Sequence, residues 1–101
     1  MKNGILIILR PFTFKQKYFL FKDGDVLLEN DLPYDSHFVK DMVSLAHQNN
    51  VDKINISGPY GYAIKMHNEI MEYNNSKFNE NSLHFCFIIY FSYVGIIIHH
   101  E

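Results

Sequence analysis

The dipeptide Asp23-Gly24 constrains the fold of this chain more than any other short stretch. It lies between two apolar runs, residues 18–21 and 26–28, and both central positions of a two-residue hairpin turn require a positive φ. The stretch KQKYFLFKDGDVLLEN therefore predicts an antiparallel β-hairpin. The unbroken apolar run at residues 5–9 predicts a preceding strand, buried on both faces and central in its sheet.

The middle of the chain predicts two helices with a strand between them. Apolar residues recur on one helical face over residues 37–50, where Asp35 or Ser36 can cap the start and Asn49-Asn50 can end the helix. Residues 51–58 alternate between apolar and polar, which predicts a strand parallel to an earlier one. A second helix is expected over residues 60–74. We interpret residues 30–36 as a loop.

The apolar segment at residues 83–98 is the least ordinary part of the chain. It is longer than a common strand of roughly 3–10 residues and shorter than the about 20 residues of a typical membrane helix. We expect a strand over residues 83–90, a bend near Gly95 and a second short extended piece. A membrane tail and a helix buried within a partner are the alternatives. The 101 residues predict a single domain, 1–101.

These elements predict an α/β fold with a mixed sheet, the order β-β-β-α-β-α-β, and two helices mainly on one face. This order, with a hairpin first and a parallel crossover after it, resembles a shortened ribonuclease H-like fold. Active members of that family hold two metal ions with carboxylates from the first strand, the first helix and the end of the fourth strand. Here residues 5–9 and 55–57 contain no acid, and Asp41 alone cannot hold two cations. The resemblance therefore implies a non-catalytic member.

The stretch SGPYGYAIK offers a candidate anion site formed by Ser57, Gly58, Gly61 and Lys65. A helix N-terminus after a glycine turn favours anions. The spacing, however, matches neither the Walker A pattern nor a dinucleotide fingerprint, and Pro59 removes one N–H donor. We interpret the stretch as a strand-to-helix turn.

Two other patterns suggest chemistry. The cations Arg10, Lys15, Lys17 and Lys22 are interleaved with aromatic residues, a pattern that suits single-stranded nucleic acid but also suits a solvated hairpin edge. A Cys86–His84 pair is geometrically possible on a strand, but no orienting acid can be named. The histidines show no metal-binding spacing. We expect no enzymatic activity, no cofactor and no metal.

The function that these patterns favour is binding, to a protein partner or to a second copy of the chain. The net charge of −2 does not favour nucleic acid, and the single cysteine favours a reducing, cytoplasmic location. The small size and the residue usage resemble phage or mobile-element accessory proteins. A nucleic-acid-binding or degenerate nuclease-like domain is the alternative, and membrane association through residues 83–98 is the second. The candidate contact residues are Phe85, Phe87, Ile89, Phe91, Tyr60 and Tyr62.

Overall fold

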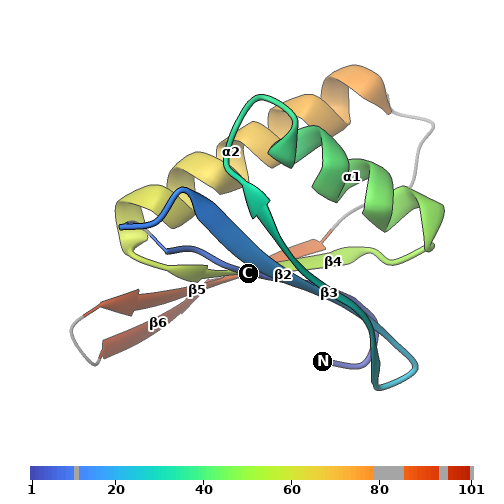
Figure 1. Cartoon of the computed structure of the whole chain (residues 1–101), viewed down its shortest axis with the longest axis horizontal. Helices are drawn as coiled ribbons and strands as arrows, with labels where there is room; N and C mark the ends of the chain where they lie inside the picture. Colours follow the sequence, from blue (N-terminus) through green and yellow to red (C-terminus); the bar gives the residue numbers. More distant parts are fainter. Residues whose placement is uncertain (11, 79–85, 94–95, 101) are drawn as a thin grey trace.

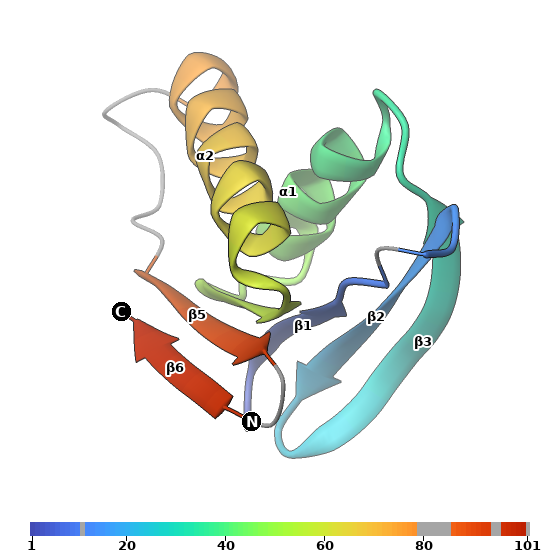
Figure 2. The same cartoon turned by 90° about the vertical axis from the view of Figure 1, so that its left-hand side faces the viewer.

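A computed structural model of the chain describes residues 1–10, 12–78, 86–93 and 96–100, with side chains described as far as residue 78. Eight elements follow one another along the chain: β1 (Gly4–Ile8), β2 (Lys15–Lys22), β3 (Asp25–Pro33), α1 (Phe38–Gln48), β4 (Lys53–Gly58), α2 (Tyr60–Lys77), β5 (Cys86–Tyr93) and β6 (Ile96–His100). The strands form one sheet in the order β3-β2-β1-β4-β5-β6. Both helices lie on the same face of this sheet (Figures 1 and 2).

The sheet is mixed because β1 has a different kind of neighbour on each side. It pairs antiparallel with β2 and parallel with β4, and β4 pairs parallel with β5. The β1–β4 pair requires a crossover, which α1 supplies above the sheet. The predicted α/β class, mixed sheet and pair of helices are thus confirmed, as is the parallel strand at residues 53–58.

The hairpin forms at the predicted turn. Asp23 and Gly24 have φ values of 54° and 87°, and the flanking residues Lys22 and Asp25 pair with each other. The interpretation of residues 30–36 as a loop was wrong for 30–33, which continue β3 and pair with β2 as far as Lys15. Leu32 packs against the core, so tertiary contact extends the strand beyond its local apolar run.

The core lies between the sheet and the helices. Its fully buried side chains come from the helix-facing positions of two central strands and from both helices: Ile5, Ile7, Ile54, Ile56, Phe38, Met42, Val43, Ala63, Met66 and Ile70. The prediction that residues 5–9 are buried on both faces was only partly right, because Leu6 and Ile8 are half-buried. They alternate with Ile5 and Ile7, so they point to the face that the helices do not cover.

The two ends of α1 differ in how well the sequence predicted their capping residues. The N-cap is His37, not Asp35 or Ser36, and it has no side-chain cap. Asp35 lies two residues before the N-cap, and its carboxylate accepts a hydrogen bond of 2.9 Å from the His37 N–H. At the other end Asn49 is the C-cap and Asn50 adopts a left-handed φ of 53°, as predicted for this pair.

Helix α2 continues to Lys77, beyond the predicted end at residue 74. Asn74 is buried, and its side-chain oxygen lies 2.9 Å from Nε2 of His47 on α1. This contact between the helices favours the additional turn. The predicted strand at 83–90 corresponds to β5, although residues 83–85 and the predicted bend near Gly95 lie outside the described residues. The second extended piece is β6.

Candidate binding cavity

A cavity of about 260 Å³ lies where β1 ends and α2 begins. It is lined by Leu9, Arg10, Thr13, Phe14, Gln16, Tyr34, Tyr62 and Lys65. The loop that carries Phe14 and the first turn of α2 come together at this end of the sheet (Figure 1). The carboxyl ends of β1 and β4 meet at the same edge because these strands are parallel. In α/β sheets this edge is the usual place for a ligand.

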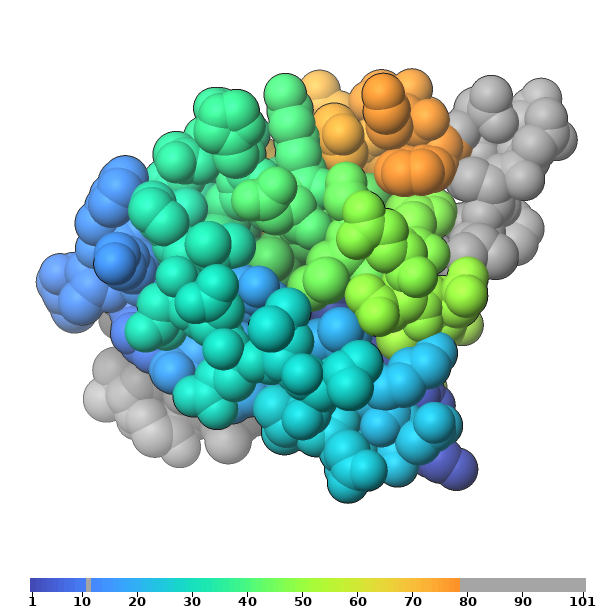
Figure 3. Space-filling view, turned by 45° about the vertical axis from the view of Figure 1, so that its right-hand side comes forward, coloured from blue at the N-terminus to red at the C-terminus, as the bar shows by residue number. Residues whose placement is uncertain are grey.

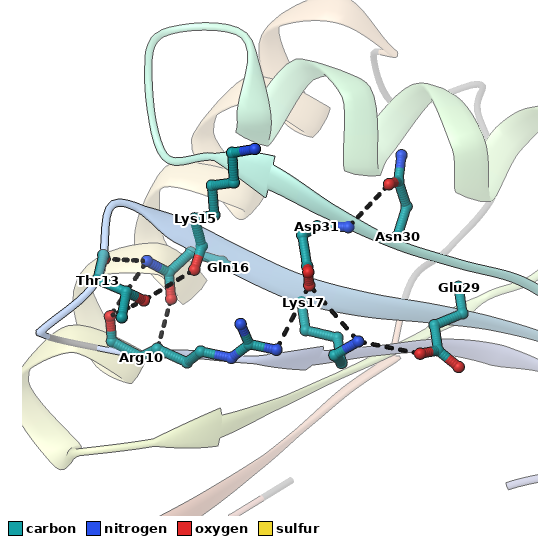
Figure 4. A network of polar contacts seen from close by, with 8 residues as sticks. All are labelled: Arg10, Thr13, Lys15, Gln16, Lys17, Glu29, Asn30 and Asp31. Carbon is teal, nitrogen blue, oxygen red and sulfur yellow. Dashed lines mark hydrogen bonds and ion pairs between the residues drawn. The ribbon is translucent and has the colours of Figure 1, made fainter.

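Gln16 fixes the loop between β1 and β2. Its side chain is only 4% exposed, and its amide oxygen accepts a hydrogen bond from the Arg10 N–H. Its amide nitrogen donates to the carbonyl oxygens of Arg10 (3.3 Å) and Thr13 (3.1 Å). Figure 4 shows this side chain enclosed by the loop. The N–H of Tyr34 donates to the Phe14 carbonyl at 3.0 Å, which ties the loop to the end of β3.

A chain of ion pairs runs from the cavity along the hairpin. Nη2 of Arg10 lies 3.4 Å from Oδ1 of Asp31, which in turn lies 3.6 Å from Nζ of Lys17. Lys17 also contacts Oε2 of Glu29 at 2.9 Å. The hydrogen bond to Glu29 is the largest cause that raises the pKa of Lys17 above its ordinary value. These groups are at least partly exposed, so each pair contributes little to stability.

The predicted nucleic-acid cations therefore do not form one basic surface. Arg10 lines the cavity, Lys17 is paired with acids, and Lys22 donates to the Asn49 carbonyl at 2.8 Å. The Lys15 side chain points away from Arg10 and Lys17 (Figure 4).

Tyr34, the residue after β3, and Lys65 on α2 supply the next part of the lining. The Tyr34 hydroxyl donates to Oε1 of Glu69 at 2.6 Å. Burial raises the pKa of Tyr34 well above its ordinary value, and the Glu69 hydrogen bond and charge raise it further. The hydroxyl is therefore protonated at neutral pH. Nζ of Lys65 lies 6.0 Å from the centre of the Tyr34 ring, within range of a cation–π contact.

Of the candidate anion-site residues, only Lys65 lines the cavity. A Cβ atom on Gly58 would lie 2.7 Å from the Leu9 Cβ, so the missing side chain allows β4 to end against Leu9. The Ser57 carbonyl accepts the Leu9 N–H at 2.8 Å. Nothing lies within 4 Å of the position that a Gly61 Cβ would take. These contacts support the interpretation of the stretch as a strand-to-helix turn.

Among the described side chains, four exposed aromatic ones occur at this end of the molecule, and we call them the aromatic rim. Tyr60 and Tyr62, both predicted contact residues, are each 52% exposed. Phe12 and Phe14, which were not among the predicted contact residues, are 98% and 67% exposed. The signal that could have found them is their position in a Pro-containing loop between two strands. This loop projects from the edge of the molecule (Figure 3).

The remaining predicted contact residues come from the apolar C-terminal segment. Phe85 lies outside the described residues. Phe87, Ile89 and Phe91 belong to β5, where the backbone register pairs them with Ile54, Ile56 and Gly58. Their side chains lie outside the described part of the structure, as do those of the Cys86–His84 pair, so both hypotheses stay predictions.

Within the described part of the chain, no helix is long and apolar enough to cross a membrane. The same part contains no group of three His, Cys, Asp or Glu side chains that could hold a metal ion. Comparisons with models of protein families, with curated proteins and with solved structures find no match to this chain. The resemblance to the ribonuclease H-like fold therefore rests on the order of the elements alone.

Proposed function

We propose that this chain is a non-catalytic protein-binding module whose contact surface is the aromatic rim. The observation that carries the proposal is the exposure of Phe12, Phe14, Tyr60 and Tyr62, from 52% to 98%. Two of these rings, Phe14 and Tyr62, also line the cavity. Large aromatic side chains that stay exposed together usually mark a binding surface, because leaving them in water forgoes the free energy of burial. Aromatic residues are also the commonest hot spots of protein interfaces.

The charges near the rim favour a protein over a nucleic acid. A protein that follows a phosphate backbone needs several cations free to contact phosphates. In this chain Lys17 is held by Glu29 and Asp31, and the chain carries a net charge of −2. Two cations, Arg10 and Lys65, line the cavity. They suit a partner segment that presents an acidic residue among apolar ones.

We also propose that the chain has no catalytic activity. The hairpin followed by a parallel crossover supports a distant relation to the ribonuclease H-like fold. The strands that would carry its metal-binding acids, β1 and β4, have none, and Asp41 lies exposed on α1. We infer a scaffold that has kept the architecture and binds without cleaving. We propose that the chain acts in the cytoplasm as an accessory protein, as small phage proteins do.

A random-peptide library displayed on phage tests the proposal. Peptides selected on the unchanged chain should share an acidic residue flanked by apolar ones. Their affinity, measured with the synthetic peptides, should fall at least about tenfold for the variant Phe12→Ser, Phe14→Ser, Tyr62→Ser, because truncating a central aromatic contact commonly costs 2 kcal/mol or more.

The matched control replaces exposed apolar residues elsewhere, Val26→Ser and Leu27→Ser, and should leave the peptide affinity unchanged. Binding of an oligothymidine of about twelve nucleotides, abolished by the rim variant, would instead support the nucleic-acid alternative. Failure to select any peptide that discriminates the rim variant from the control would contradict the proposal.

A further inference from the structure

We propose that the cavity binds a small planar aromatic ligand that carries one phosphate group. This goes beyond protein binding at the rim and stands on the lining of the cavity alone. Among the residues that the structure describes with side chains, the lining contains two cationic ones, Arg10 and Lys65, and no Asp or Glu. It also contains three aromatic rings, those of Phe14, Tyr34 and Tyr62.

The two cations reach the cavity from different elements. Arg10 follows β1, and Lys65 belongs to α2, one turn beyond its start. An anion that contacts both side chains gains charge-assisted hydrogen bonds, which are about twice as strong as neutral ones. The guanidinium of Arg10 can also hold a phosphate or carboxylate through two parallel hydrogen bonds.

Both cations can exchange their present contacts for a ligand. Arg10 contacts Asp31 at 3.4 Å, which is long for a charge-assisted hydrogen bond, and both side chains are more than a third exposed. Lys65 is exposed and lies over the Tyr34 ring at 6.0 Å. Asp31 therefore competes with a bound anion for Arg10. Removing the Asp31 charge should strengthen binding.

The aromatic side chains of the lining favour a ligand whose anionic group is attached to a flat ring. The hydroxyl of Tyr34 is engaged by Glu69, which leaves its ring as a neutral, apolar part of the lining. Phe14 and Tyr62 are more than half exposed, so a flat ring placed against them would remove apolar surface from water. The volume of about 260 Å³ lies just below the range of roughly 300–1,000 Å³ that is typical of drug-sized ligands. One ring system with one charged substituent fits this volume better than a dinucleotide does.

Titrations followed by ¹H–¹⁵N NMR test the inference on the full chain. The probes are phenyl phosphate and adenosine monophosphate, their neutral counterparts phenol and adenosine, and inorganic phosphate. We expect the two ring-bearing phosphates to shift amide signals of residues 9–10, 12–16, 34 and 60–65, and to bind at least about tenfold more tightly than the neutral rings or phosphate alone. Preference for adenosine monophosphate indicates a nucleotide, and preference for phenyl phosphate indicates a phosphorylated aromatic side chain or metabolite.

Three variants test whether the ligand binds at the cavity. Lys65→Gln should weaken binding about tenfold, whereas Lys77→Gln, at the far end of the same helix, should not change it. Asp31→Asn should tighten binding severalfold because Arg10 loses its competing partner. Lys65 and Asp31 are exposed, so we expect these variants to fold. The inference is overturned if no ring-bearing phosphate shifts these signals, or if Lys65→Gln and Lys77→Gln bind alike.

Discussion

Two groups of exposed apolar side chains in the described part of the chain differ in what surrounds them. The edge strand β3 exposes Val26, Leu27 and Leu28, between 38% and 60%. The aromatic rim exposes four rings beside a cavity. Acids flank the first group along β3, whereas the cavity beside the second group is lined by the cations Arg10 and Lys65. Exposed apolar area alone therefore does not identify the functional surface, and the neighbouring charges must be considered with it.

The acids of β3 oppose pairing with a second copy. Two β3 strands related antiparallel by a two-fold axis place one residue opposite itself. If the two-fold axis passes through Leu27, Asp25 lies opposite Glu29 of the second copy, and if it passes through Leu28, Asp25 lies opposite Asp31. If the axis passes through Glu29, the two Glu29 side chains lie opposite each other. Like charges directly opposite each other are destabilising. Charged side chains are a known protection of edge strands against aggregation, and β3 shows that arrangement.

The largest expected effect concerns the loop at the aromatic rim. Replacing Gln16 with Leu leaves the Arg10 N–H and the Thr13 carbonyl without their partner. An unsatisfied buried polar group costs about 1–3 kcal/mol, so we expect the free energy of unfolding to fall by about 2–3 kcal/mol.

Urea denaturation measures this loss. Gln48→Leu, at the exposed end of α1, is the matched control and should change stability by no more than about 0.5 kcal/mol. Equal stability of the two variants would show that the loop does not depend on the buried amide.

A smaller effect is expected from neutralising the β3 edge with Asp25→Asn, Glu29→Gln and Asp31→Asn. Each cross-strand charge pair contributes about 0.2–1 kcal/mol, so self-association should occur at a severalfold lower concentration than for the unchanged chain. Analytical ultracentrifugation measures this concentration.

The control for that variant removes the same charges from exposed positions elsewhere, with Asp41→Asn, Asp52→Asn and Glu72→Gln. If both triple variants associate equally, only net charge matters and the contrast between the two surfaces fails.

The smallest effect concerns Tyr34. Replacing it with Phe removes the 2.6 Å hydrogen bond to Glu69 and should lower stability by about 1 kcal/mol at neutral pH. Because the pKa of Tyr34 is raised in the folded state, its contribution is complete below the ordinary value of about 10 and is lost as pH rises through the folded value.

The stability difference between the unchanged chain and Tyr34→Phe should therefore shrink above about pH 10. Thermal unfolding from pH 7 to pH 11 measures it, with the exposed Tyr62→Phe as control. A difference that stays constant over this range would mean that Tyr34 does not titrate as inferred.

Local sequence predicted the elements because their signals act over a few residues. The Asp23-Gly24 turn depends on two φ values, and the end of α1 depends on the left-handed Asn50. Arg10, Tyr62 and Lys65 were each noted, but for three different hypotheses. Nothing in the sequence placed them beside Phe14 and Tyr34, because their grouping depends on how β1, β3 and α2 pack.

The sequence by itself determined the Asp23-Gly24 turn, the order of the strands and helices, and the absence of acids from β1 and β4. It did not determine where β3 and α2 end. Only the tertiary structure decided that two cations and three aromatic rings from three separate stretches line one cavity. The physical reason is the distance along the chain over which each kind of interaction acts. Turn and helix preferences act between neighbours along the chain, whereas a cavity is formed by side chains whose contacts exist only after the sheet has assembled.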